Sequence, residues 1–437
     1  MVAEDRKDLI GKNISDTDFL LLDEVIISNE VENIYDCAFE HHNLSSVVIP
    51  NTVTRIGDYA FYGCHNLTSV SIPNSVKMIG KDAFAHCEKL SSVYIEDGVN
   101  TIGSNAFFYC EQLSSINLPN SITSIGDGAF YECRKLSDIN IPNSMTSIGM
   151  RAFARCGIKC ANIPDGVKSI EDYAFEYCSK LISLKIPKSV HFISDRAFNY
   201  CEELRSVEIS QENKVFDSRD NCNAIIRTKD DTIVFFCKNT IIPDGVRKID
   251  SQSCSKCAGM KRIRIPQSFN SITMNTFAGC TDIETITVDE RHRKFDSRNN
   301  CNAIINTKTN TLILGSNKTT IPLGVEVIGK GALACCDKLN SISIPDSVVS
   351  IEKYAFSNCK SLVSVEIPGS VEQISENTFN GCENLKSILL GEGVKYIENR
   401  AIIRCDSLEI ISIPNSVESI GDLFIFPKCK RVKIMVP

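Results

Sequence analysis

The 437-residue chain contains no tryptophan, only six histidines and 7% aromatic residues. It also lacks any apolar run close to the roughly 20 residues that cross a bilayer as a helix. Its formal net charge of −7 gives no sign of the concentrated basic face that binds a nucleic-acid backbone. We therefore expect no nucleic-acid partner and no membrane-spanning segment.

The N-terminus lacks the features of a secretory signal peptide. Residues 1–11 read MVAEDRKDLIG, without an apolar core and without a small-residue cleavage site. The later run Phe19–Leu22 is too short and lies between acidic residues. Either the protein stays inside the cell, or this chain lacks its export signal.

Catalytic and metal-binding motifs are also missing. The histidines form no repeated Cys/His, Ser/His/Asp or HExxH arrangement, and no glycine-rich phosphate loop is present. Cys254 and Cys257 have a zinc-like spacing, but no second CxxC or nearby histidine pair would complete four ligands. We expect no catalytic residue, no metal and no cofactor, and hence not an enzyme.

What the sequence does contain is a repeat. The string Ile-Pro-Asn-Ser-Val occurs at 72–76 and again at 413–417, and variants of it recur at steps of 22 or 23 residues. Two steps, from Ile209 to Ile242 and from Val288 to Ile321, are 33 residues long. Eighteen recognisable turns cover nearly the whole chain, which is typical of a solenoid.

One unit shows how each turn is built. Val70 and Ile72 are two residues apart and so face one side of a strand. Pro73 lacks an N–H and ends that strand. The segment from Ala83 to Cys87 predicts one short helical or 3₁₀ turn with one side inward. A single unit buries too little to fold alone, so the stable object is the stacked array.

The recurring pattern L-x-S-V-x-I-P-x-S-V-x-x-I-G-x-x-A-F-x-x-C resembles the BspA-like branch of the leucine-rich-repeat family. The resemblance implies an α/β, β-rich repeat solenoid: a right-handed superhelix with a parallel β-sheet on one face and short helical or 3₁₀ turns on the other. It also implies a surface protein, of bacteria or protists, that binds host proteins, matrix proteins or other cells.

The two long steps resemble each other and predict two β-hairpin inserts. Residues 216–219 and 295–298 both read Phe-Asp-Ser-Arg, 79 residues apart. Each insert is either a binding feature or a duplicated packing variant that changes the curvature. The predicted organisation is an N-terminal cap at 1–24, an array at 25–209, a long repeat at 210–241, repeats at 242–288, a second long repeat at 289–320 and an array at 321–437.

Most of the 21 cysteines form one column with the period of the repeat, for example Cys64, Cys87 and Cys110. A buried free thiol behaves as a small hydrophobe, and a column of one cysteine per turn is unlike a disulfide framework. We therefore predict free, buried thiols in this column. Cys160 falls on an outward position of the sheet and is the predicted exposed thiol.

Candidate contact residues come from the outward strand positions, which are mostly small and polar. Lys261, Arg262 and Arg264 break that pattern, and Arg291 and Arg293 follow at the second insert. These residues predict a basic patch for an acidic protein partner, although most charge runs are merely solvated. Tyr94 is an aromatic outward residue and a further candidate.

Three functions remain open at this point. The chain is a protein-binding or adhesive scaffold at the cell surface or secreted, an intracellular (cytoplasmic) interaction module, or a structural spacer without a specific ligand. The sequence leaves the partner's identity and the oligomeric state undetermined.

Overall fold

The computed structural model describes residues 23–250, 259–272, 276–277, 280–421 and 433–435. The chain divides into two compact units, residues 1–229 and 230–437, which we call unit 1 and unit 2. The predicted cap at 1–24 lies almost wholly outside the described residues. So do Cys254, Cys257 and Cys429.

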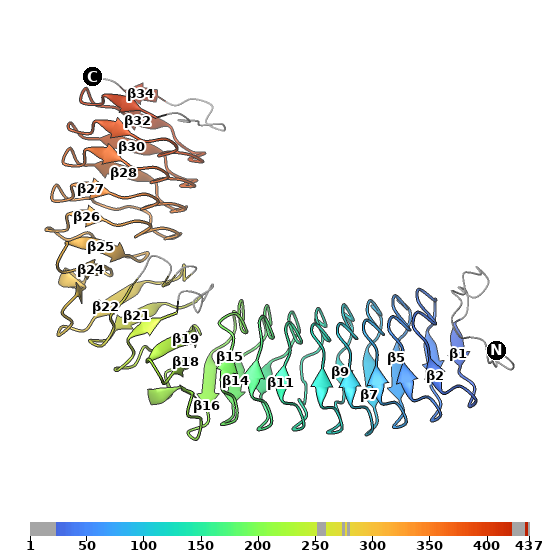
Figure 1. Cartoon of the computed structure of the whole chain (residues 1–437). Coiled ribbons are helices and arrows are strands. Elements are labelled where there is room, and N and C mark those ends of the chain that lie inside the picture. Colours follow the sequence, from blue (N-terminus) through green and yellow to red (C-terminus); the bar gives the residue numbers. More distant parts are fainter. Residues whose placement is uncertain (1–22, 251–258, 273–275, 278–279, 422–432, 436–437) are drawn as a thin grey trace. The chain divides into compact units, whose positions relative to one another are not determined.

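Unit 1 is a stack of turns, and parallel strands line one side of it in two runs, which together we call the first sheet (Figure 1). Valine pairs with valine and isoleucine with isoleucine between neighbouring strands, as in Val70↔Val93 and Ile72↔Ile95. This register confirms the repeat spacing. The first run is β1 (Glu24–Ile26), β3 (Ser46–Val48), β5 (Ser69–Ile72), β7 (Ser92–Ile95) and β9 (Ser115–Ile116), and the second run is β12 (Cys160–Asn162), β14 (Ser183–Ile186) and β16 (Ser206–Ile209).

A second set of parallel strands follows the Pro-Asn-Ser turn, two residues from each turn, and pairs in two runs. Its inward members, such as Ile56, Ile79 and Ile102, are fully buried. The first run is β2 (Asn33–Ile34), β4 (Arg55–Ile56), β6 (Met78–Ile79), β8 (Thr101–Ile102) and β10 (Ser124–Ile125), and the second run is β11 (Ser147–Ile148), β13 (Ser169–Ile170) and β15 (Phe192–Ile193).

The third side of each turn, the turn side, is not helical, and in this detail the sequence-based expectation of a helical or 3₁₀ turn is wrong. The N–H groups of Tyr59, Phe61 and Gly63 donate to carbonyl oxygens of the next turn, at 2.7–2.8 Å. A helix would direct those N–H groups along its own chain. Left-handed residues, with φ of 57° at Tyr59 and 69° at Gly63, make the lateral bonding possible.

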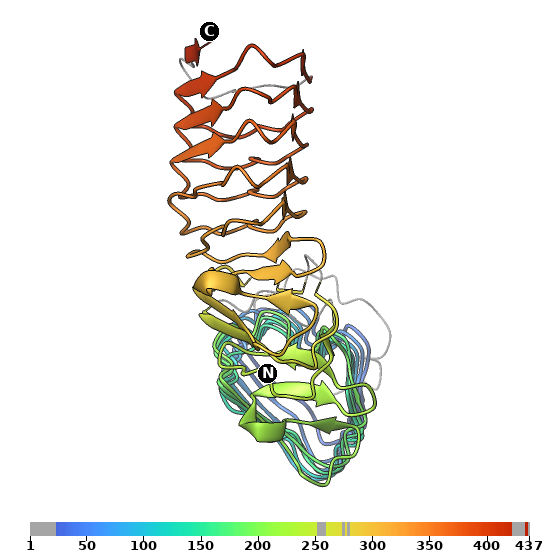
Figure 2. The same cartoon turned by 90° about the vertical axis from the view of Figure 1, so that its left-hand side faces the viewer.

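The interior of unit 1 is a set of columns of identical residues (Figure 2 views the stacked turns nearly end-on). Leu67, Leu90 and Leu113 are all fully buried, which confirms one continuous core. Phenylalanine rings stack in parallel at centroid spacings of 5.0–5.5 Å. This phenylalanine column comprises Phe61, Phe84, Phe107, Phe130 and Phe153.

Most thiols of the described cysteine column are buried as predicted, Cys201 only partly, and most of them also donate to a backbone carbonyl oxygen. The Sγ atoms of Cys87 and Cys110 donate to the carbonyl oxygens of Phe61 and Phe84 in the preceding turn, at 3.2 and 3.1 Å. Burial raises the pKa of these two thiols well above the ordinary value. All cysteines among the described residues are free, and Cys160 is exposed.

Unit 2 repeats the same architecture. Its strands are β19 (Thr232–Phe236), β20 (Lys248–Ile249), β21 (Arg262–Ile265), β22 (Thr285–Val288), β23 (Phe295–Asp296), β24 (Ile304–Asn306), β25 (Thr311–Leu314), β26 (Val327–Ile328), β27 (Ser350–Ile351), β28 (Ser364–Ile367), β29 (Gln373–Ile374), β30 (Ser387–Leu390), β31 (Tyr396–Ile397), β32 (Ile410–Ser412), β33 (Ser419–Ile420) and β34 (Lys433–Met435). Strands β28, β30, β32 and β34 pair in parallel as one sheet. Strands β26, β27, β29, β31 and β33 belong to the other.

The second insert is a hairpin. Strand β24 pairs antiparallel with β23 and β25, and β25 then pairs in parallel with β26. The last strand of the hairpin therefore takes a place in the stack. In the first insert β17 (Phe216–Asp217) and β18 (Ala224–Arg227) pair antiparallel in the same way. Both inserts carry a 3₁₀ turn, η2 (Arg219–Asn221) and η3 (Arg298–Asn300).

Candidate partner-binding surfaces

The outward column of the first sheet matches the sequence-based register. Tyr94 on β7 is 58% exposed and lies opposite Ser71 of β5. On its other side the Asn117 amide bonds the backbone of Ile95, with N–O distances of 2.7 and 2.6 Å. Tyr94 is thus an isolated ring between small polar residues of unit 1, whereas the five basic candidates belong to unit 2.

The basic candidates of unit 2 fall into two groups. Arg264 on β21 contacts the carboxylates of Asp244 and Asp289 at 3.2 and 2.9 Å. Arg291 contacts Asp289 at 3.1 Å. Hydrogen bonds from Arg291 lower the pKa of Asp289 to about 2. Arg264 and Arg291 are therefore already neutralised, which reduces what they offer to a partner.

Lys261, Arg262 and Arg293 form the other group. All three are exposed, and none has a carboxylate within 4 Å among the described residues. Arg262 and Arg264 also line a small apolar hollow of about 100 Å³. Arg293 lies apart from that hollow, in the cleft described next.

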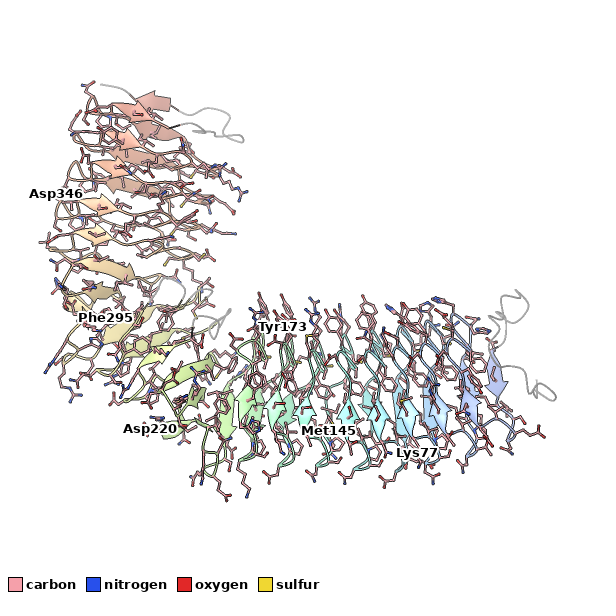
Figure 3. The ribbon with its side chains drawn as sticks, viewed as in Figure 1. Lys77, Met145, Tyr173, Asp220, Phe295 and Asp346 are labelled. Atoms are coloured by element: carbon pink, nitrogen blue, oxygen red, sulfur yellow. The ribbon has the colours of Figure 1, made fainter. Side chains whose placement is uncertain are left out.

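A cleft of about 480 Å³ lies beside the second insert. Its charged lining residues are Arg293, Lys294 and Lys308, and none of its described lining residues is acidic. The other described lining residues are Asn270, Ser271, Ile272, Phe295, Asn306, Thr307 and Ile313. We call this the insert cleft. Phe295 on β23, labelled in Figure 3, is one of these lining residues.

A buried histidine fixes the edge of the insert cleft. His292 Nε2 lies 2.8 Å from the carbonyl oxygen of Phe269, and the N–H groups of Lys294 and Phe295 donate to His292 Nδ1 at 3.1 Å. The first insert has Asn213 at the corresponding position, with bonds to backbone groups on both sides. The two inserts are therefore anchored alike but carry different side chains around the anchor.

An aromatic surface lies on the turn side of unit 1, and the sequence analysis missed it. The turn side is marked in Figure 3 by Tyr173, at the edge opposite Lys77. Aromatic rings follow one another over five consecutive turns, with neighbouring centroids 5.1–5.4 Å apart. The first ring, His41, is exposed, and the others are half-buried. The members of this aromatic band are His41, Tyr62, His86, Phe108, Tyr109 and Tyr131.

The signal for the band was present in the repeat itself. Its members occupy the two positions between phenylalanine and cysteine in Ala-Phe-x-x-Cys, for example Phe108 and Tyr109 before Cys110. Tyr173, Tyr177 and Tyr200 add further rings on the same side of unit 1, where the Arg155 guanidinium lies 4.6 Å from the Tyr177 ring centroid. Aligning every position of the repeat, not only the strand, would have revealed this surface.

The described part of the chain contains no cluster of three or more His, Cys, Asp or Glu side chains able to hold a metal ion. Among the same residues, no helix has the length and apolar character that crossing a bilayer requires.

The fold and its columns define a leucine-rich-repeat solenoid. A family model described as "BspA type Leucine rich repeat region (6 copies)" matches residues 17–125, 100–224, 235–315 and 305–433. The chain therefore belongs to the BspA-type leucine-rich-repeat family. No curated protein matches it.

Several solved structures are similar. A leucine-rich repeat protein from Bacteroides ovatus is 24% identical over 95% of this chain and 92% of its own, with a TM-score of 0.48. A leucine rich cell surface protein from Faecalibacterium prausnitzii is 26% identical over 94% and 89%, with a TM-score of 0.43. The T. pallidum leucine rich repeat protein is 34% identical over 42% and 83%, with a TM-score of 0.34.

Proposed function

We propose that the chain is a non-enzymatic protein-binding scaffold of the surface type, and that it captures an acidic segment of a partner protein in the insert cleft. The observation that carries the proposal is the charge of that cleft: three cations converge on it, and no carboxylate among the described residues pairs with them. Lys261 and Arg262 would extend the contact along β21, and Tyr94 is a separate candidate contact in unit 1.

The cleft is chemically suited to carboxylates. Arg293 offers a planar fork of N–H donors and Lys294 and Lys308 offer ammonium groups, which together match glutamate or aspartate side chains. Amide and hydroxyl groups from Asn306 and Thr307 complete a polar lining. A volume of about 480 Å³ lies in the ordinary range of roughly 300–1,000 Å³ for ligand sites. The cleft is therefore large enough to hold side chains, not only to attract them.

Binding of a fluorescein-labelled hepta-glutamate peptide, followed by anisotropy at low salt, tests the proposal. Arg293→Glu with Lys308→Glu should weaken binding tenfold or more, because these changes replace attraction by repulsion. The matched control is Lys214→Glu with Lys229→Glu, at the equivalent, exposed positions of the first insert. It changes the net charge equally and should alter binding less than twofold.

Equal weakening by both double variants would show non-specific attraction and overturn the assignment of the cleft. No binding by the unaltered chain would favour the structural spacer. Surface display is tested separately, by antibody labelling of the chain on intact cells of the producing organism. Labelling that requires permeabilised cells would favour the intracellular module instead.

A further inference from the structure

The aromatic band of unit 1 is not required by the fold, because unit 2 supplies an internal comparison. At the same two positions of the repeat, unit 2 has Ser357 and Asn358, and then Asn380 and Gly381, with no aromatic ring. The backbone is the same: φ is 62° at Tyr109, 58° at Asn358 and 76° at Gly381. Left-handed φ is unfavourable for a bulky residue and natural for glycine or asparagine. Tyrosine at this position therefore carries a conformational cost that folding does not demand.

The band offers hydrogen-bond donors as well as apolar area. The hydroxyl groups of Tyr62, Tyr109 and Tyr131 have no hydrogen-bond partner among the described residues, and all three side chains are half-buried. Tyrosine combines a rigid ring with a polar end and is enriched where proteins contact one another. The hydroxyls are thus available to a ligand that needs donors.

The way the rings contact one another indicates what kind of ligand fits. Phe108 and Tyr131 stack at 5.4 Å with an interplanar angle of 10°, and the His86 ring meets Phe108 at 67°. Only Phe108 and Tyr131 stack face to face; at His41, Tyr62 and His86 the neighbouring rings meet edge to face, so ring orientation alternates along the band and forms ridges. A sugar ring would need an open aromatic face to stack on. A peptide does not need such an open face, because its side chains can lie between the rings and its carbonyl groups can accept hydrogen bonds from the tyrosine hydroxyls.

The repeat spacing matches one peptide conformation. A polyproline II helix has three residues per turn at ~3.1 Å each, so equivalent residues recur every ~9.3 Å. Solenoid turns recur every ~4.8 Å, so two turns span ~9.6 Å. Every third residue of a peptide that runs along the stack would therefore lie opposite an equivalent position two turns further on. Polyproline II also leaves its backbone carbonyls without internal hydrogen bonds.

We propose that the aromatic band is a docking surface for a proline-rich segment of a protein partner, bound in the polyproline II conformation. The five turns from His41 to Tyr131 span ~19 Å, which accommodates about six residues at ~3.1 Å each. The rings of Tyr62, His86 and Phe108 form the ridges. The hydroxyls of Tyr62, Tyr109 and Tyr131 donate to peptide carbonyls. This surface is separate from the insert cleft and takes a ligand of different chemistry.

The test uses fluorescein-labelled decaproline as the probe, the full chain as the receptor and anisotropy as the readout. The variant Tyr109→Asn with Tyr131→Ser introduces residues that unit 2 carries at these positions, so the fold should be retained, and circular dichroism checks this. We expect decaproline affinity to fall at least tenfold. Tyr177→Asn with Tyr200→Asn makes the same kind of change at a stacked pair outside the band and should change affinity less than twofold.

Two further arms separate the alternatives. Hepta-glutamate binding should be unchanged in the Tyr109/Tyr131 variant, which distinguishes this inference from the proposed function of the insert cleft. Chitohexaose and a glycine-serine decapeptide should not compete with decaproline. The inference is overturned if the unaltered chain fails to bind decaproline, if chitohexaose displaces it, or if both tyrosine variants lose affinity equally.

Discussion

Replacing one buried ring of the phenylalanine column should lower the unfolding free energy far more than replacing its half-buried chain neighbour. Phe107 and Phe108 are neighbours in the chain, yet Phe107 is fully buried and Phe108 lies in the aromatic band. The Phe107 ring stacks between Phe84 and Phe130, with both centroids 5.4 Å away. Phe107→Ala therefore leaves a cavity between two phenylalanine rings that no longer have a stacking partner on that side. Such a change costs about 3–5 kcal/mol of unfolding free energy.

Phe108→Ala is the matched control. It removes the same side chain from a half-buried site, where the lost burial is worth about 1 kcal/mol. Urea unfolding followed by far-UV circular dichroism gives both values. Hydrogen–deuterium exchange then shows where protection decreases, because each turn touches only its neighbours. We expect the decrease in Phe107→Ala to centre on residues 84–130. Equal destabilisation by the two variants, or a decrease spread evenly over unit 1, would refute the stacked-column reasoning.

Three other predictions concern reactivity, close packing and pH. Iodoacetamide should alkylate exposed Cys160 in the native protein while buried Cys110 reacts only after unfolding; peptide mapping by mass spectrometry that found comparable rates would contradict this. Gly80→Ala should destabilise unit 1 by several kcal/mol, since a Cβ there would lie 2.4 Å from a backbone carbon of Gly57; a urea midpoint that stayed unchanged would be inconsistent with the close approach. The carboxylate of Asp289 should contribute stability that is present above pH ~4 and lost as pH falls towards about 2, because its folded pKa is depressed; the difference between the unaltered chain and Asp289→Asn, measured by urea unfolding from pH 2 to 7, should shrink over that window.

The sequence predicted the strands and the core because both depend on a local pattern. Val70 and Ile72 alternate inward with the period of a strand, and the cysteine column follows from identity at a fixed spacing. The turn side was predicted wrongly because the spacing of Ala83 and Phe84 is compatible with a helical turn. Only the adjacent turn, which accepts lateral hydrogen bonds from the N–H groups of Asp82 and Phe84, makes a different backbone favourable.

The candidate surfaces were predicted less well because charge was counted without its partners. Arg264 seemed free in the sequence, but Asp244 and Asp289 reach it from residues 20 and 25 positions away. Those offsets lie near one repeat period, so alignment of the turns would have brought the carboxylates into view. Arg293 differs from Arg264 in this respect. It is exposed, and no acidic residue among those described lies within ion-pair distance of it.

The two proposed surfaces have a common origin in the way a solenoid separates its columns. Inward columns are constrained by packing, and the cysteine column also by the thiol's bond to the preceding turn, as for Cys110 and Phe84. The outward columns of the turn side and the inserts have no such constraint, since asparagine, glycine and tyrosine share one backbone conformation there. Two inserts with the same anchor, His292 in one and Asn213 in the other, can likewise differ in charge around it. Binding chemistry in this family member is therefore expected in columns whose residues change between units while the backbone does not.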